Sequence, residues 1–491
     1  MYLNIFKHNS SKLKPIKKFF REMTENKKIK NAQPIVTHSK KNIASYNMGH
    51  YFMEFINLVQ GFLLFYFYEA EIGLASWLVG LGLIIYAVYD VINDLLVGYL
   101  VDRPFKFTKK WGRRFPWMIV SFIPMLFSFL LIFSPPNVDA QEQPWILFGW
   151  LIFTTCLFDT IESFFSINFY SMFPYKFRTT GERLTSGSFS VYISMIGIVF
   201  GSIIPPMIVI FGNINSYVLM AWLTVIFCLI PFPLFIPGIR EEKEIIENYI
   251  ENYKKEEKES IFLAMREVLT QRSFLFYMIF VFTYHVLNNT ITASLFYYVN
   301  FVLGEPEDIV TIISIMLLLG SLVAVPLWYR YSRKTQNKKR TILLAGMVMI
   351  IFGFKMSFVF NLISFMIVAF AYGMGLGGFI SIMDPVLSDC IDESIITHKK
   401  RREGFFHSIN FFESNLSRVL QALILTVTHE LTGFIEGSAT QPSSALFGIH
   451  LHIGIIPAII FLGGSLIFWK FYDITPERSR EIKEKLVDLG I

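Results

Sequence analysis

Long apolar blocks dominate the sequence, and several exceed the roughly 20 residues that an α-helix needs to cross a hydrocarbon core. Proline and glycine recur inside these blocks, which helices in a bilayer tolerate. No block alternates as a transmembrane β-strand does, which excludes a membrane barrel. We therefore predict an all-α polytopic membrane protein. Twelve spans are expected, at Tyr46–Tyr68, Leu74–Leu100, Phe115–Phe133, Trp145–Phe173, Leu184–Phe211, Tyr217–Pro237, Phe274–Leu303, Val310–Tyr329, Thr341–Phe360, Leu362–Leu387, Gly404–Phe434 and Leu446–Phe471.

The composition agrees with a membrane protein and disfavours a soluble enzyme. Of the 491 residues, 53% are hydrophobic and 17% are charged, whereas about a quarter of the residues are charged in a soluble domain. The three cysteines lie inside or at the ends of apolar blocks. Neither a disulfide framework nor a cysteine-based zinc site is therefore expected.

The charges of the connections predict the orientation. Lys and Arg cluster in the connections after the second, fourth, sixth, eighth and tenth spans, whereas the opposite connections contain neither and carry acids. By the positive-inside rule, both termini face the cytoplasm. The first 44 residues are basic and lack the pattern of a signal peptide. This tail and the short loops hold the net charge of +6, which suits lipid headgroups and needs no nucleic-acid partner.

One long charged connection divides the spans into six plus six. Basic turns that follow the second and eighth spans suggest a weak internal repeat, as in transporters built from parallel repeats with a site between the halves. The expected parts are a basic cytoplasmic tail (1–44), an amino-terminal six-helix bundle (45–238), a charged cytoplasmic linker (239–272), a carboxy-terminal six-helix bundle (273–472) and a cytoplasmic tail (473–491).

Ionisable residues inside the spans predict a cation site. Glu54 lies in the first span, and Asp90 and Asp94 lie four residues apart on one face of the second. Because an intramembrane charge costs a few kcal/mol at least, such residues face a cavity by default. Carboxylates that converge in a low dielectric need a proton or cation between them. Alternatively, Asp94 only caps or pairs near the membrane interface.

A polar stripe in the fourth span predicts a solute site. Its residues recur every three or four positions and so share one helix face: Asp159, Glu162, Ser163, Ser166 and Tyr170. Carboxylates accept hydrogen bonds from hydroxyl groups, and an aromatic ring can cover a sugar face, so the stripe suits a polyhydroxylated ligand. Alternatively, Tyr170 belongs to the interfacial aromatic belt and Ser166 only packs helices together.

Arg418, near the middle of the eleventh span, is the expected counter-charge for these acids. Glu413, five residues earlier on the same helix, is poorly aligned for pairing with it. We therefore expect Arg418 to face Glu54, Asp90, Asp159 or Glu162 in the other bundle. Lys355 in the ninth span is expected to reach outward along the helix as a structural residue.

Two segments resemble a known family. Tyr89–Asp102 (YDVINDLLVGYLVD) and the following Trp111–Trp117 (WGRRFPW) resemble the signature of the glycoside–pentoside–hexuronide:cation symporters. This branch of the major facilitator superfamily is typified by the melibiose permease, and the animal sodium-dependent lysophosphatidylcholine symporter is similar over the same stretch. Glu54 lies where the family's opening helix usually has an acid. The resemblance implies the major facilitator fold, with twelve transmembrane helices in two six-helix bundles.

The resemblance also assigns roles to single residues. It implies that Asp90, Asn93 and Asp94 bind the cation, with Asp90 and Asp94 as Na⁺ ligands, and that Ser163 supplies a hydroxyl in place of the permease's threonine. The solute pocket departs from the permease. Ser166 replaces a sugar-binding aspartate, Ser190 an arginine and Asn415 a lysine, whereas Tyr170 keeps the stacking aromatic and Arg418 lies one turn from Asn415.

We therefore expect a secondary active transporter, a symporter of Na⁺ or H⁺ with a sugar or glycoside, which works by alternating access to a midplane site. The expected solute-binding residues are Glu54, Asp159, Glu162, Ser166, Tyr170, Ser190, Asn415 and Arg418. No catalytic residue and no cofactor besides the coupling ion is expected, and the partners are the solute, the cation and membrane lipids. A monomer in the plasma membrane is expected. The alternatives are a lysophospholipid symporter, a non-transporting membrane sensor or scaffold, and an intramembrane enzyme, for which no nucleophile–base pair is evident.

Overall fold

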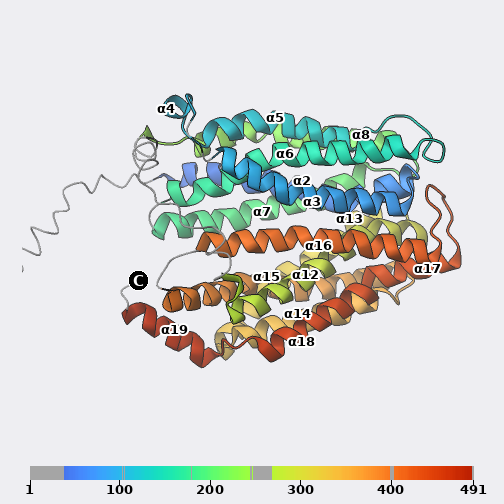
Figure 1. Cartoon of the computed structure of the whole chain (residues 1–491). Coiled ribbons are helices and arrows are strands. Elements are labelled where there is room, and N and C mark those ends of the chain that lie inside the picture. Colours follow the sequence, from blue (N-terminus) through green and yellow to red (C-terminus); the bar gives the residue numbers. More distant parts are fainter. Residues whose placement is uncertain are drawn as a thin grey trace, which may run out of the picture.

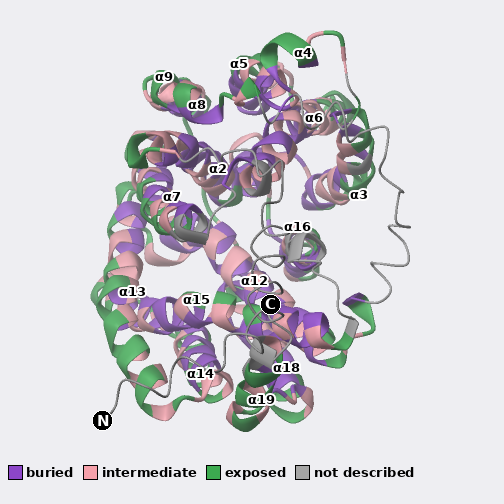
Figure 2. Ribbon diagram, turned by 90° about the vertical axis from the view of Figure 1, so that its left-hand side faces the viewer, coloured by how far each residue is buried: buried purple, intermediate pink, exposed green. Residues whose placement is uncertain are grey.

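A computed structural model describes residues 38–101, 103, 105–177, 180–243, 246, 268–398 and 403–488. Most of the predicted amino-terminal tail and most of the predicted linker lie outside these residues. The described part of the chain is helical and contains no strand. Its helices run side by side along the length of the molecule (Figure 1) and form two bundles when viewed along their axes (Figure 2).

The amino-terminal bundle surrounds the first long helix, α2, of which most residues are buried. Within it, α2 packs on α7, and α6 packs on both α3 and α5. Its elements are α2 (Lys40–Tyr66), η1 (Phe67–Glu71), α3 (Ser76–Val101), α4 (Thr108–Trp111), α5 (Phe115–Ile132), α6 (Pro144–Lys176), α7 (Thr180–Ile208), α8 (Ile214–Leu229), α9 (Phe232–Phe235) and η2 (Ile236–Ile239).

The carboxy-terminal bundle contains the second half of the described helices. Its elements are α12 (Arg272–Tyr297), η3 (Tyr298–Leu303), α13 (Asp308–Thr335), α14 (Lys338–Met356), α15 (Leu362–His398), α16 (Glu403–Thr432), α17 (Ser443–His450), η4 (Leu451–Ile455), α18 (Ile456–Phe471) and α19 (Pro476–Asp488). The two bundles meet where α2 packs on α12, α3 on α16 and α7 on α13.

Nine helical segments of the described chain are long and apolar enough to cross a membrane. The other three expected spans form helices α2, α14 and α16, which are 27, 19 and 30 residues long. They carry more polar residues, and α2 and α16 pack against helices of both bundles. A helix covered by protein needs less apolar surface than one that faces lipid, which suits α2 and α16. Helix α14 differs from the nine segments by its charged residues Lys338, Lys339, Arg340 and Lys355.

The two ends of the molecule carry different elements. Figure 1 shows α4 and α19 at one end and α17 at the other. We call them the predicted cytoplasmic end and the predicted outer end, after the charge pattern of the connections. The segment predicted as a carboxy-terminal tail contains helix α19, which packs on α15. Arg478 of α19 forms ion pairs with Glu393 and Asp473 there.

An internal repeat appears at the predicted outer end. Helix α2 continues into the π-helical η1, and α12 continues into the π-helical η3. The sequences align without a gap, LFYFYEAEIG at residues 64–73 with LFYYVNFVLG at residues 295–304, and they share Leu, Phe, Tyr and the final Gly. Each ends at a glycine with positive φ, 82° at Gly73 and 65° at Gly304, a conformation that glycine adopts without steric cost. The two halves thus begin with equivalent hairpins.

Candidate functional site

The predicted cation residues of α3 face the polar stripe of α6. The side-chain amide of Asn93 donates to Oδ2 of Asp159 at 3.0 Å and to Oγ of Ser163 at 3.0 Å. The hydroxyl of Ser163 donates in turn to Oδ1 of Asp94 at 2.6 Å. The three- and four-residue spacings place these side chains on facing sides of two packed helices. Asn93, Asp94, Asp159 and Ser163 therefore form one hydrogen-bonded network, which we call the acidic network.

Asp90 connects this network to the other bundle. Its carboxyl group lies within hydrogen-bonding reach of the carboxyl group of Asp159. Its Oδ2 also accepts a hydrogen bond from the side-chain amide of Asn415 on α16, at 2.9 Å. Two carboxyl groups in contact cannot both stay ionised unless a proton or cation lies between them. A proton or cation bound between Asp90 and Asp159 would therefore lie beside the contact with the second bundle.

The donor atoms suit a hard cation. Carboxylate, amide and hydroxyl oxygens are the ligands that such ions prefer, and all three kinds lie between α3 and α6. Within the described residues, however, His, Cys, Asp and Glu side chains nowhere converge in groups of three or more that could hold a metal ion. A cation shared by Asp90 and Asp94 would draw its other ligands from Asn93, Asp159, Ser163 or the solute.

Glu54 lies apart from the carboxylates of α3. On α2 it interacts electrostatically with Arg418 and with Tyr170 of α6. Tyr170 also interacts with Glu162, whose carboxylate is contacted by the hydroxyl of Ser166 one turn later. Along the predicted stripe of α6, Asp159 and Ser163 belong to the acidic network, and Tyr170 lies toward Glu54. Glu162 lies between these two groups, because it also interacts electrostatically with Asp90 and Asp94.

Arg418 lies on the side of α16 that faces the first bundle. Its charge acts on the carboxylates of Glu54, Asp90 and Glu162. Glu413 is buried, and neither of its carboxylate oxygens has a hydrogen-bond partner among the described residues. This geometry agrees with a cross-bundle role for Arg418 and not with a pairing along α16.

The remaining predicted residues make local contacts. Ser190 on α7 donates to the carbonyl oxygen of Gly187 in its own helix, at 2.9 Å. Lys355 is exposed and places its ammonium over the ring of Phe352, 5.3 Å from the centroid. Nothing in these contacts brings Ser190 to the acidic network.

Sequence reasoning missed one buried polar cluster. At the predicted outer end, Glu69 of η1 contacts His429 of α16, which contacts His452 of η4. The sequence places Glu69 in a short connection and the two histidines in the last two spans, and no local pattern joins them. The sequence offered two signals for this cluster. Glu69 is an acid within two residues of a span, and His429 and His452 are histidines inside spans.

A second polar cluster lies at the predicted cytoplasmic end of the first bundle. The two ring nitrogens of His38 contact Glu182 at 2.9 Å and Glu242 at 2.8 Å. The hydrogen bond with Glu242 raises the pKa of His38. Burial raises the pKa of Glu242, but the bond with His38 and the charge of Lys176 outweigh it and bring the pKa to about 2. This cluster holds η2 and the start of the linker against α6 and α7.

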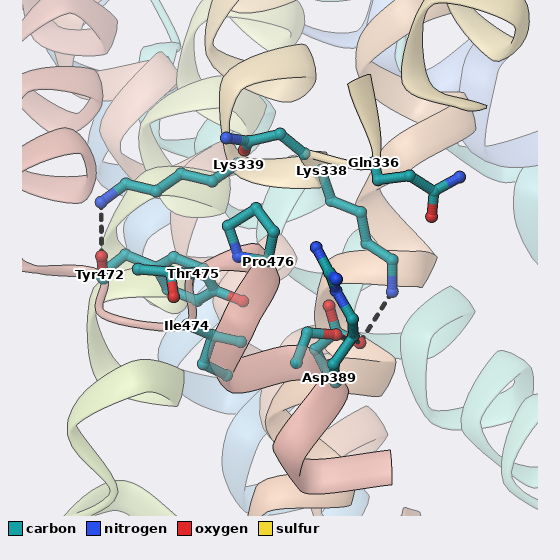
Figure 3. Close-up of a pocket in the computed structure, with 11 residues that line it drawn as sticks. Gln336, Lys338, Lys339, Asp389, Tyr472, Ile474, Thr475 and Pro476 are labelled. Carbon is teal, nitrogen blue, oxygen red and sulfur yellow. Dashed lines mark hydrogen bonds and ion pairs between the residues drawn. The ribbon is translucent and has the colours of Figure 1, made fainter. Parts of the chain in front are cut away.

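A shallow pocket lies at the same end of the second bundle, where the turn between α13 and α14 meets α15 and α19 (Figure 3). Lys338 pairs with Asp389 at 2.7 Å, and the ammonium of Lys339 donates to the carbonyl oxygen of Tyr472. The basic turn therefore contacts residues of its own bundle in this structure.

The comparisons with known proteins agree with this architecture. The family model for MFS/sugar transport proteins matches residues 45–476. The sodium-dependent lysophosphatidylcholine symporter 1 of Gallus gallus is 23% identical over 442 residues, which cover 82% of this chain and 80% of that protein. The lactose permease of Lactobacillus delbrueckii is 22% identical over 421 residues, 81% of this chain and 64% of that protein. A solved structure of a D-xylose–proton symporter matches with a TM-score of 0.58 at 13% identity, over 88% of this chain and 97% of that one.

Proposed function

This chain belongs to the MFS/sugar transport protein family, and from that premise we propose that it is a secondary active symporter in which Na⁺ or H⁺ drives the uptake of a small solute. The relatives described above are transporters and not enzymes. The fold that the chain shares with them places two bundles around a central interface, where alternating access exposes one site to each side in turn.

The acidic network carries this proposal. Asn93, Asp94, Asp159 and Ser163 are joined by hydrogen bonds inside the first bundle. The bond from Asn415 to Asp90 ties the network to the second bundle. A cation that binds here neutralises the carboxylates and changes the contact between the bundles at the same time. Ion binding and bundle movement are thereby coupled, as a symporter requires.

A sugar or glycoside is the proposed solute. Glu54, Glu162, Ser166 and Tyr170 combine carboxylate acceptors, a hydroxyl and an aromatic ring, and Arg418 supplies a cationic donor across the interface. Hydroxyl groups of a sugar can bond to the carboxylates while an apolar sugar face covers the ring. Ser190 and Asn415 complete the proposed lining.

A lysophospholipid is the second candidate. The observation that favours it is the similarity to sodium-dependent lysophosphatidylcholine symporters over 82% of the chain. The Arg418 guanidinium would then bind the phosphate, because its planar donors match phosphate oxygens.

The sidedness completes the proposal. The basic connections and both termini face the cytoplasm of a cell whose plasma membrane holds the protein as a monomer. The structure has its predicted outer end closed by cross-bundle contacts, among them the two bonds from Ser76 to Glu436 at 3.1 Å. Opening that end and closing the other would complete the transport cycle.

Uptake into proteoliposomes tests the proposal. Purified protein is reconstituted, and labelled sugars, glycosides and lysophosphatidylcholine are offered under an inward Na⁺ gradient, an inward H⁺ gradient or no gradient. We expect accumulation of one solute class only under a cation gradient, and none with Asp94→Asn. Accumulation that Asp94→Asn leaves unchanged would contradict the cation site. No accumulation of any solute, with the variant and the wild type behaving alike in cells, would favour a sensor or scaffold.

A further inference from the structure

Five buried side chains from both bundles form one hydrogen-bonded chain at the predicted outer end. His429 Nδ1 lies 2.8 and 2.9 Å from the two carboxylate oxygens of Glu69. His429 Nε2 lies 3.1 Å from Nε2 of His452, and His452 Nδ1 lies 2.6 Å from Oγ of Ser294. The hydroxyl of Tyr297 donates to Glu69. None of these side chains has exposed surface, so water does not satisfy them.

The chain lies where the two repeats meet. Tyr297 of α12 donates to Glu69 of η1, and Asn300 of η3 donates to the hydroxyl of Tyr66 of α2 at 2.7 Å. Glu69 and Asn300 occupy equivalent positions in the repeat, as do Tyr66 and Tyr297. Equivalent residues of the two repeats are thus joined by hydrogen bonds between the bundles. These contacts join the two bundles and thereby close the outer end. Both η1 and η3 are π-helical, a shape often found at functional sites.

The hydrogen bonds allow two arrangements, which differ by one proton. In the first, the hydroxyl of Ser294 donates to the carbonyl oxygen of Thr290 at 2.6 Å, so its oxygen accepts from Nδ1–H of His452. Nε2 of a neutral His452 is then an acceptor, and Nε2 of His429 must donate to it. A carboxylate only accepts, so Nδ1 of His429 must also donate. His429 therefore carries both protons and pairs, as a cation, with the Glu69 anion.

When the donors and acceptors are exchanged along the chain, it holds one proton fewer. In this second arrangement Ser294 donates to His452, His452 donates to His429, and a neutral His429 donates to an ionised Glu69. The buried cluster would then keep a net negative charge, which is costly without a cation nearby. Arg418 lies 11 residues earlier on α16, about 16 Å along the helix. Lys355, at the outer end of α14, is exposed over Phe352.

The neighbouring titratable groups also favour the protonated form. Tyr66 on α2 and Tyr217 on α8 interact with Tyr297, and His450 on α17 interacts with His452. Glu71 on η1 and Glu307 before α13 interact in turn with Tyr66 and Tyr217. The carboxylate of Glu71 is held inside the first bundle by Tyr217 at 2.8 Å and by the amide of Gly212 at 2.9 Å. No cation replaces the proton among these groups.

We propose that Glu69, His429 and His452 form a proton-binding lock, which takes up one proton when the outer end closes and releases it to the outer solution when the bundles separate there. This inference rests on the alternating access proposed above. It adds a proton site at a gate, distinct from the acidic network between α3 and α6. Closure joins Glu69 of one bundle to His429 of the other, and opening returns all three groups to water.

The proton balance predicts how closure depends on pH. A histidine in water is half protonated near pH 6.5, and a glutamate near pH 4.3. Above about pH 6.5 the open state holds neither histidine proton, so closure must take one up. Below that pH both histidines of the open state are charged, so closure must release one. The closed population therefore peaks near pH 6.5 and falls on either side, by up to about tenfold per pH unit in the closing equilibrium.

Spin-label distances test the lock without transport. Gln141 and Ala439 are exposed in connections of the two bundles at the outer end. Both are replaced by cysteine in a chain that lacks Cys156, Cys228 and Cys390, and the distance distribution between the labels is measured from pH 5 to 9 without sodium or solute. We expect the short, closed distance to dominate near pH 6.5 and to decline toward both extremes.

Two variants should each remove one limb of this profile. With Glu69→Gln, a neutral His429 can donate to the amide oxygen, closure needs no proton, and the decline above pH 6.5 disappears. With His452→Gln, only one histidine charges in the open state, and the decline between pH 6.5 and 5 disappears. Glu71→Gln is the matched control, because Glu71 is bonded inside one bundle, and it should keep both limbs.

Other outcomes would overturn the lock. A closed population that does not change with pH, or an alkaline decline that survives Glu69→Gln, contradicts it. If sodium or solute shifts the distances but pH does not, the lock is wrong and the proposed transport stands. If pH shifts the distances as expected but proteoliposomes accumulate no solute, the lock stands and the proposed transport is wrong.

Discussion

Asp90 in the first bundle and Asn415 in the second are joined by a hydrogen bond of 2.9 Å across the bundle interface. Asp90 also contacts Asp159, which accepts from Asn93 of the acidic network. A change in the charge of this carboxyl pair therefore reaches both bundles directly. This contact is a direct route by which a bound cation can affect their relative position.

Neutralising either aspartate of α3 should uncouple the cation from the solute. We expect Asp90→Asn and Asp94→Asn to fold but to lose accumulation against a gradient, because an amide cannot supply the negative charge that attracts the cation. The measurement is sodium-driven uptake in proteoliposomes, with Glu142→Gln, an exposed acid of an outer connection, as control. Accumulation at the wild-type rate in either aspartate variant would show that the site is assigned wrongly.

The hydroxyl of Ser163 should tune the affinity for sodium. It accepts from Asn93 and donates to Asp94, so its removal takes one hydrogen-bond partner from each group. We expect Ser163→Ala to raise the sodium concentration for half-maximal uptake about tenfold, equivalent to roughly 1.4 kcal/mol, and Ser163→Thr to stay near wild type. Ser121→Ala, which removes only a bond to the backbone oxygen of Trp117, is the control. Equal uptake without sodium would indicate proton coupling instead.

Arg418 should be essential, whereas Lys355 should not. The charge of Arg418 acts on carboxylates of the other bundle, and truncating one member of a buried charge pair costs about 3–5 kcal/mol. We expect Arg418→Gln to reduce uptake more than a hundredfold and Arg418→Lys to retain part of it. Lys355→Gln should be silent, since that ammonium is exposed. Normal uptake by Arg418→Gln would refute the cross-bundle role.

Glu413 should be a source of instability. Its side chain is buried, and its carboxylate oxygens have no hydrogen-bond partner within the described chain. Burying a polar group without a partner costs about 1–3 kcal/mol on the scale of protein mutations, and more for a charge. We expect Glu413→Gln to raise the apparent melting temperature in detergent, and Glu142→Gln to leave it unchanged. A lower melting temperature for Glu413→Gln would reveal a partner that depends on the carboxylate.

The His38 cluster should stabilise the protein in a defined pH window. Because the pKa of His38 is raised, its contribution is complete below the ordinary value near 6.5 and is lost as the pH rises through the higher value in the folded state. The pKa of Glu242 is about 2, so its contribution is complete above its ordinary value of 4.5 and is lost as the pH falls toward 2.

The cluster therefore acts fully between about pH 4.5 and 6.5. Glu242→Gln should lower the apparent melting temperature most in that window, in line with a loss of roughly 1–3 kcal/mol for a hydrogen bond to a charged group. The difference from wild type should shrink by pH 9. Arg240→Gln, an exposed neighbour, is the control. A difference that is the same at pH 6 and pH 9 would exclude His38 as the titrating group.

The sequence by itself was sufficient for the class of fold. Block length and composition are local properties, and they predicted the polytopic helical fold that the structure and the family match confirm. Helical spacing also placed Asp90 with Asp94, and Asp159 with Ser163, on single helix faces. The bond between Ser163 and Asp94 follows from those two faces meeting. The functional roles of these residues stay predictions.

The rotation and pairing of the helices were decided only by the tertiary structure. A periodic pattern shows which residues share a face but not which face of another helix lies opposite. Glu54 was expected beside Asp90 and Asp94, but packing turns it toward Tyr170 and Arg418. Glu69 and His429 are 360 positions apart in the chain. Their contact exists because the repeats that begin the two halves meet at the outer end, and no property of either segment alone determines that contact.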